Sequence, residues 1–205
     1  MTATATRSVP VWDPLLRLFH WSLVAAFFIA YLTGEDLRPL HLWAGYVVTG
    51  LLVFRLLWGV VGPRHARFGD FVRPPREVLA YLRDLARGRA RRYLGHNPAG
   101  GAMIVLLLAG LAGTVASGLL LEELSEPAAA PAALAEHDED DEGHDSPAAE
   151  ALEEVHEFFA NLTLLLVLVH VLGVLVSSHL HHENLVRAMI TGRKTLPAEE
   201  DGGGR

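Results

Sequence analysis

Residues 155–180 read VHEFFANLTLLLVLVHVLGVLVSSHL, an apolar run with His156 near its start and His170 in its middle. At about 1.5 Å per residue, a helix of this length crosses the ~30 Å hydrocarbon core of a bilayer. His156 and His170 are separated by nearly four helical turns, so they project from almost the same face, about 21 Å apart along the axis. The segment therefore predicts one membrane-spanning helix with an imidazole near each membrane surface.

Three further apolar runs precede this one, and each is long enough to span a membrane. They cover roughly residues 15–33, 40–61 and 100–121. The second run stops at Gly62-Pro63, where a flexible residue precedes one that lacks an N–H. Apolar residues make up 51% of the chain, which fits a protein whose solvent is largely lipid. We expect an all-α fold, an integral membrane four-helix bundle.

The charged residues predict the topology. Nine arginines lie between the second and third spans, whereas the loops after the first and third spans are acidic. By the positive-inside rule, the arginine-rich loop faces the cytoplasm. An even number of spans then places both termini on that side, in agreement with Arg187, Arg193 and Lys194 after the fourth span.

Four histidines fall within the predicted spans or at their ends, where ionisable groups are costly and indicate function. His20 lies near the inner start of the first span, and His41 lies near the outer start of the second. Because the fourth span runs from outside to inside, His156 is level with His41 and His170 is level with His20. The spacing predicts two bis-histidine sites stacked across the bilayer, an arrangement typical of b-type haem.

The absence of cysteine limits how such cofactors are held. The chain contains no Cys, which excludes disulfides, iron–sulfur clusters and the thioether attachment of c-type haem. Two haem b groups are therefore expected to bind non-covalently. Since imidazoles fill both axial positions, we expect outer-sphere electron transfer rather than oxygen activation, and we assign no catalytic residue.

Three arginines and one glycine are candidate neighbours of the haems. Arg17 and Arg38 each precede a span histidine by three residues, so each either meets an anionic propionate or extends to the membrane interface. Arg55 follows His41 by 14 residues, on the same face but at the inner level, and we assign it to the inner haem. Gly45, one turn after His41, leaves room for the outer macrocycle, although ordinary helix packing explains it almost as well.

These motifs as a set resemble a known family. They comprise Trp12-Asp13, Arg17-Leu-Phe-His20-Trp21, His41 with Gly45, Gly95-His96-Asn97-Pro98, and His156 with His170. The chain resembles the prokaryotic cytochrome b561 family, which is allied to the b-type cytochrome subunits of nickel–iron hydrogenases, over most of residues 9–195. The resemblance implies that the four histidines ligate two haems in these pairs. It also implies electron exchange with the quinone pool in the bacterial inner membrane.

The resemblance leaves the second redox partner open. It is a periplasmic cytochrome c, a hydrogenase or reductase complex in the membrane, or superoxide. The oligomeric state, a homodimer included, is also open, and we expect no nucleic-acid partner. His65 and His96 are expected in loops without a ligand role.

Residues 122–154 depart from the family pattern. They are rich in Pro, Ala and acidic residues and include His137 and His144, so we expect a disordered periplasmic insert. Such a tract binds divalent cations, steers a basic electron carrier or is a solvated spacer. Residues 1–195 form one domain on this reading, and residues 196–205 form a disordered cytoplasmic tail.

Two further alternatives stay open. Residues 76–87 have an amphipathic pattern, which is typical either of a helix on the anionic inner leaflet or of a solvated loop helix. The rival function is a divalent-metal transporter that uses the intramembrane histidines and the His/Asp-rich loop. Against it, the spans contain no Asp or Glu except at their ends, and dication transport generally needs such carboxylates.

Overall fold

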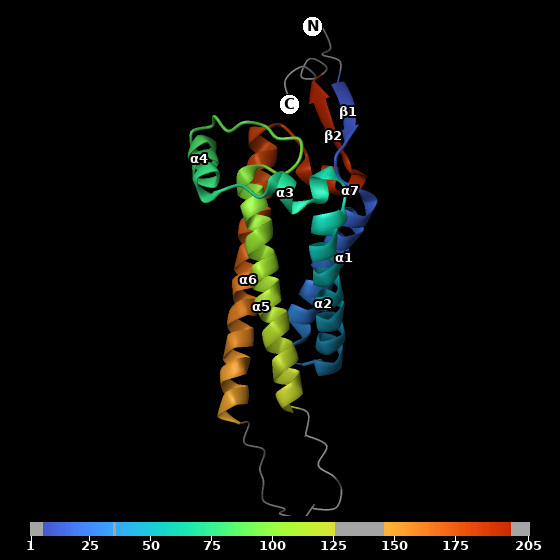
Figure 1. The fold of residues 1–205 in the computed structure, drawn as a ribbon, viewed down its shortest axis with the longest axis vertical. Coiled ribbons are helices and arrows are strands. Elements are labelled where there is room, and N and C mark those ends of the chain that lie inside the picture. Colours follow the sequence, from blue (N-terminus) through green and yellow to red (C-terminus); the bar gives the residue numbers. More distant parts are fainter. Residues whose placement is uncertain (1–5, 35, 126–145, 198–205) are drawn as a thin grey trace, which may run out of the picture.

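Four long helices dominate the protein. The computed structural model describes residues 6–34, 36–125 and 146–197 (Figure 1). Each long helix is long and apolar enough to cross a membrane. They are α1 (Pro14–Thr33), α2 (Arg38–Val61), α5 (Pro98–Ser125) and α6 (Pro147–Leu180). The predicted helical membrane bundle is confirmed, and every predicted span lies within one of these helices.

Local sequence explains where the long helices begin. Asp13 precedes α1, and its Oδ1 accepts a hydrogen bond from the backbone N–H of Leu16 at 3.0 Å. Ser146 caps α6 in the same way through the N–H of Ala149 at 3.2 Å. Proline occupies the first turn of α1 and α6, where the missing N–H removes no helical hydrogen bond.

The ends of the acidic segment 122–154 differ from expectation. Helix α5 continues to Ser125 and α6 begins at Pro147, so the prediction of disorder is wrong for both ends. The Ser146 cap and the acidic Glu150 in the first turn favour the longer α6, because a carboxylate there interacts well with the helix dipole. Residues 126–145, which include His137 and His144, lie outside the described residues.

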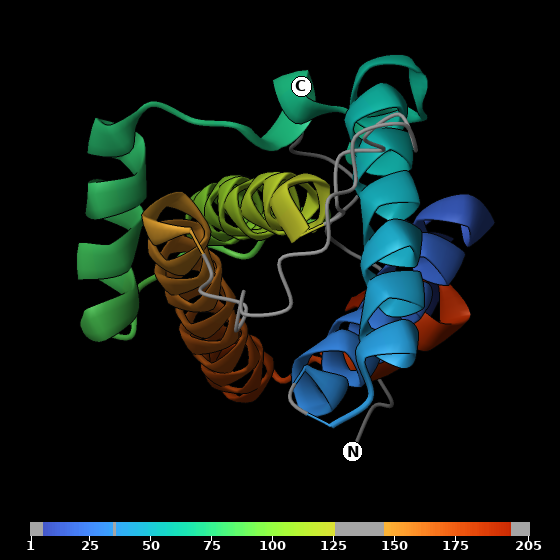
Figure 2. The ribbon, with the colours of Figure 1, turned by 90° about the horizontal axis from the view of Figure 1, so that it is seen from below.

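The four helices form two pairs. Helix α1 packs mainly on α2, and α5 packs mainly on α6, as the view along the bundle shows (Figure 2). An apolar cluster in the middle of the bundle joins the pairs. It contains Ala26, Phe27, Val48, Leu52 and Leu111, with Leu108, Val115, Leu164 and Val167 packed against them. Water-excluding side chains therefore fill the bundle between its two ends.

We call the two ends of the bundle inner and outer. The inner end carries residues 62–97, α7 (Leu185–Thr191) and two strands, β1 (Thr6–Pro10) and β2 (Arg193–Pro197). The outer end carries the α1–α2 connection and the facing ends of α5 and α6. Residues 62–97 contain three short helices: η1 (Arg64–Ala66), α3 (Phe68–Phe71) and α4 (Pro75–Ala86).

The two strands are a feature that the sequence did not indicate. They pair antiparallel, from Thr6 opposite Pro197 to Pro10 opposite Arg193. Residues 196 and 197 therefore belong to a strand, and the disordered tail was predicted to begin too early; residues 198–205 lie outside the described residues. Five-residue strands that pair across almost the whole chain leave no periodicity strong enough to recognise.

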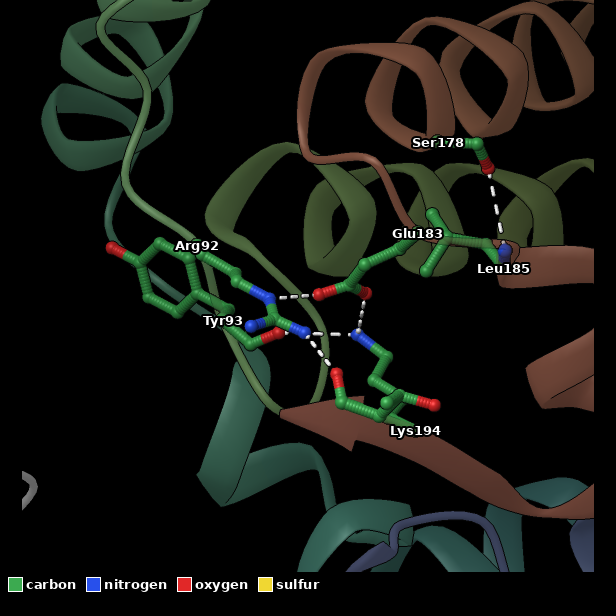
Figure 3. Close-up of polar contacts among 7 residues, drawn as sticks. Arg92, Tyr93, Ser178, Glu183, Leu185 and Lys194 are labelled. Carbon is green, nitrogen blue, oxygen red and sulfur yellow. Dashed lines mark hydrogen bonds and ion pairs between the residues drawn. The ribbon is translucent and has the colours of Figure 1, made fainter. Parts of the chain in front are cut away.

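A buried ion-pair network holds the inner end together (Figure 3). Lys194 is only 6% exposed. Its Nζ donates to the carbonyl oxygen of Tyr93 at 3.1 Å and lies 3.3 Å from Oε2 of Glu183. Arg92 pairs with Oε1 of the same carboxylate, and its Nη2 donates to the carbonyl of Thr195 at 2.5 Å. Burial lowers the pKa of Lys194, and the Glu183 carboxylate opposes that shift.

Removing the carboxylate of this network should destabilise the protein. We expect Glu183→Gln to lower the free energy of unfolding by about 3–5 kcal/mol, because the buried Lys194 cation loses its counter-charge. Lys194→Met removes the cation instead and keeps an apolar chain of similar length, so it should cost less. Thermal unfolding in detergent, followed by circular dichroism, measures both variants. Equal midpoints for Glu183→Gln and the wild type would contradict this view of the network.

Candidate functional site

The structure places His41 and His156 face to face, and it places His20 and His170 at the inner end of the bundle. His41 on α2 faces His156 on α6, with ring centroids 6.0 Å apart and planes inclined by 76°. At the inner end, His20 on α1 and His170 on α6 lie within electrostatic range of each other, and so do His96 and His170. In each pair one histidine comes from the α1–α2 pair of helices and the other from α6.

A helix end fixes the His41 ring. Its Nδ1 lies 2.9 Å from the carbonyl oxygen of Ala30. Because α1 ends at Thr33, this carbonyl belongs to the last turn, where no later amide of the helix reaches it. A carbonyl only accepts hydrogen bonds, so Nδ1 carries the hydrogen and Nε2 of the neutral ring keeps its lone pair.

The His156 ring is fixed in the same way from α5. Its Nδ1 lies 2.9 Å from the carbonyl oxygen of Thr114 and 3.2 Å from Oγ of Ser117. The approach depends on Gly118, because a Cβ there would lie 2.8 Å from Cε1 of the imidazole. The lone pair of His156 is therefore also on Nε2. The Ala30 and Thr114 carbonyls did not stand out in the sequence, whereas a glycine at 118 is the kind of small residue expected where another group approaches a helix closely.

Two imidazoles in this arrangement suit one shared metal. A ring nitrogen lies about 2 Å from a bound metal and about 1.2 Å from its own ring centre, so axial imidazoles have centroids about 6.4 Å apart. The 6.0 Å between His41 and His156 fits that spacing. Metal-bound histidines usually donate their second N–H to a carbonyl or carboxylate, as both rings do here.

The surroundings of this pair are a largely apolar pocket. Phe27, Val48, Leu111 and Val115 line it together with both histidines. Gly45 is part of the lining, and a Cβ built there meets nothing within 4 Å. The predicted open space beside Gly45 is therefore present on the side of α2 that lines the pocket.

Polar side chains lie where this pocket reaches the outer end. The hydroxyl of Tyr46 donates to the carboxylate of Glu122, with oxygen distances of 2.6 and 2.7 Å. The hydroxyl of Tyr31 donates to Oδ1 of Asn161 at 2.8 Å. Tyr31, Tyr46 and Glu122 all line the pocket, so hydrogen-bonded groups link α1 to α6 and α2 to α5 around it.

The inner pair has a different environment. Nδ1 of His20 is buried and has no hydrogen-bond partner among the residues that the structure describes. The ring also contacts Trp21, with centroids 5.1 Å apart. A buried, unpaired ring nitrogen costs about 1–3 kcal/mol, and such exceptions call for a partner outside the polypeptide.

Arg55 is buried near the inner end, at the level where the sequence placed it. It is 2% exposed, and its Cζ lies 4.8 Å from the ring centre of Phe68 and 5.8 Å from that of Phe71. Its Nη1 is buried without a hydrogen-bond partner among the described residues. A desolvated cation with an unused donor is suited to an anionic group such as a propionate.

The other two predicted arginines have different surroundings. Arg17 donates through Nη1 to the carbonyl of Ile190, and a Cβ on Gly192 would come within 3.2 Å of its Nε. Its guanidinium thus lies at the C-terminal end of α7, which the sequence did not suggest. Arg38 is exposed in the first turn of α2. A contact of either residue with a haem stays a prediction.

The sequence did not predict that His96 is buried. Its ring lies 4.5 Å from that of Trp12 and 4.9 Å from that of Phe71, centroid to centroid. Nδ1 is buried without a hydrogen-bond partner among the described residues. Burial, with a contribution from Arg55, lowers the pKa of His96 to about 3. The ring is therefore neutral near pH 7. It is buried against Trp12 and Phe71 although it belongs to a loop.

Comparison with known proteins agrees with the resemblance of the motifs. The model of the family described as prokaryotic cytochrome b561 matches residues 11–192. The matched range contains all four long helices and the four span histidines. No curated protein and no solved structure matches the chain.

His96 should make the stability of the protein depend on pH. Because its pKa falls from 6.5 to about 3 in the folded chain, only the unfolded chain binds a proton between these values. The free energy of unfolding therefore decreases as the pH is lowered through this window. His96→Phe keeps a ring between Trp12 and Phe71 but does not titrate. Its unfolding midpoint should fall less with decreasing pH, and parallel curves for the two proteins would count against a buried, neutral His96.

Proposed function

Since the chain belongs to the prokaryotic cytochrome b561 family, we propose that its histidines hold two b-type haems and that electrons cross the membrane between them. Family membership and the four apolar helices make it a bacterial integral membrane protein that binds b-type haem and transfers electrons. The number of haems, their ligands and their redox partners are what we propose beyond family membership.

The observation that carries this proposal is the facing pair His41 and His156. The rings lie 6.0 Å apart, and each Nδ1 is hydrogen-bonded to a backbone carbonyl. Each Nε2 would then be the ring nitrogen available to ligate a metal. His20 and His170, which interact at the inner end, are proposed as the second pair of ligands.

Haem iron with two imidazole ligands supplies one-electron chemistry without an open position for substrate. The protein's own groups do the rest. The Ala30 and Thr114 carbonyls hold the two outer imidazoles in the ligating tautomer. Arg55 supplies a buried positive charge for an anionic group at the inner end. The apolar cluster between the two levels excludes water from the middle of the bundle.

We propose that the inner end faces the cytoplasm and that the protein resides in the inner membrane with both termini inside. The nine arginines of residues 64–92 support this orientation, as does the gathering of residues 62–97, β1 and β2 at one end. The family resemblance supports the quinone pool as one partner. A periplasmic cytochrome c, a hydrogenase or reductase complex, or superoxide is the other.

The structure gives little support to a divalent-metal transporter. Among the described residues, no group of three or more His, Cys, Asp or Glu side chains could hold a metal ion. The facing rings of His41 and His156 support a haem site instead.

Haem content tests the proposed ligands. The wild type should carry two haems per chain, and His41→Ala and His156→Ala should each carry one, because one axial ligand is lost. His170→Ala should lose the other haem and also destabilise the bundle. Pyridine haemochrome quantitation, normalised to protein, measures each variant.

His65→Ala and His137→Ala are the controls, and both should keep two haems. His65 lies in η1, and His137 lies in the segment outside the described residues. A colourless wild type from haem-replete cells, or a full haem complement in His156→Ala, would refute the assignment.

The space beside Gly45 provides a second test. Gly45→Phe should fill the pocket between α2 and the outer histidines and remove one haem. Gly50→Phe is the matched control on the same helix, because a Cβ at Gly50 also meets nothing within 4 Å but Gly50 does not line the pocket. Haem quantitation as above compares them. Equal haem loss in the two variants would indicate a general effect of the large side chain on α2.

A further inference from the structure

Helix α4 lies across the direction of the long helices. Figure 1 views it nearly along its axis, whereas Figure 2 views it from the side. In both views it lies to one side of α5 and α6. Figure 1 shows that it lies at the inner end of these helices and not beside their middle. It contacts α5, and its Tyr81 packs on Tyr93, with ring centroids 5.8 Å apart.

One side of α4 packs on the protein. Tyr81 is buried at 6% exposure, and Val78 and Leu85 are half-buried. At about 100° per residue these three side chains share one side of the helix. The contacts of α4 with the rest of the chain are thus made through a single strip.

A second strip of α4 is apolar but has no partner within the described residues. Leu79 and Leu82 are 53% and 43% exposed, and the helical period places them next to the packed strip. Continuing round the helix, Arg76, Arg83 and Arg87 follow directly after the leucines. All three arginines are exposed.

The acids of α4 lie apart from the leucines. The helical period puts Glu77 and Asp84 between the arginines and the packed strip, on the far side of the helix from Leu79 and Leu82. Arginines that border an exposed apolar strip, with acids opposite, are the pattern of a helix lying in a membrane interface. Residues 64–97 carry nine arginines against three acids, so the surrounding surface is also cationic.

We propose that α4 is a membrane-surface helix that docks on anionic phospholipid at the inner end of the bundle. Leu79 and Leu82 insert between the acyl chains, and Arg76, Arg83 and Arg87 bind the headgroup phosphates. The position near the ends of the membrane-spanning helices puts α4 at the level where headgroups lie. Polybasic surfaces beside a membrane are attracted to anionic lipid.

A second copy of the chain fits this strip less well than lipid. Two leucine side chains supply far less apolar surface than the roughly 1,200 Å² that a specific protein interface buries. The bordering arginines of two copies would also repel each other in a symmetric contact.

Single-cysteine labelling of the full-length protein tests the proposal, because the natural chain contains no cysteine. Leu82→Cys places a polarity-sensitive fluorophore on the exposed apolar strip. Ala80→Cys is the matched control, since Ala80 is also exposed but lies on the polar side of α4. Both proteins are placed in nanodiscs with brominated acyl chains, made of phosphatidylcholine alone or mixed with phosphatidylglycerol.

We expect the lipid bromines to quench most of the fluorescence at position 82 and little of it at position 80, where aqueous iodide should quench instead. Quenching at position 82 should increase with phosphatidylglycerol. Arg76→Gln/Arg83→Gln/Arg87→Gln should abolish that increase. Equal quenching at the two positions would overturn the proposal, and so would quenching that does not depend on lipid charge. Protection of position 82 only when two chains share a disc would assign the strip to a second copy instead.

Discussion

An imidazole inside a membrane bundle has two ring nitrogens to satisfy, and this requirement organises the outer half of the protein. A buried polar group without a partner costs about 1–3 kcal/mol. For His41 and His156, a carbonyl satisfies one nitrogen of each ring. The second nitrogens are left to whatever occupies the space between rings 6.0 Å apart. That arrangement depends on three features: the position of α6 opposite α1 and α2, the glycine at 118, and the end of α1 at Thr33.

In the inner half, the described residues do not satisfy this requirement. His20, Arg55 and His96 each bury a nitrogen without a hydrogen-bond partner among the described residues. The segment between α2 and α5 folds back under them, and the phenyl rings of Phe68 and Phe71 cover the Arg55 guanidinium. Strand pairing and the Lys194 network then fasten the end of the chain to this layer. A protein that binds an anionic cofactor here needs both the unused donors and the cover that keeps water away from them.

The sequence predicted the parts of the protein that depend on periodicity. Apolar runs located the four membrane helices, and the interval between His156 and His170 predicted which histidines would be neighbours. It did not predict contacts made by chemistry common to every residue, because the Ala30 and Thr114 carbonyls are backbone groups. The β1–β2 pairing and the contact of Arg17 with Ile190 join distant segments with no local pattern. His96 lies in a loop, as predicted, but its burial was not predictable because it comes from Trp12 and Phe71, on two other segments.

Electron paramagnetic resonance of the oxidised, purified protein tests the central claim most directly, because the spectrum of ferric haem reports its axial ligands. The account predicts two low-spin ferric signals of bis-imidazole type in each chain. A high-spin signal, a single low-spin species at full haem loading, or no iron signal would contradict it.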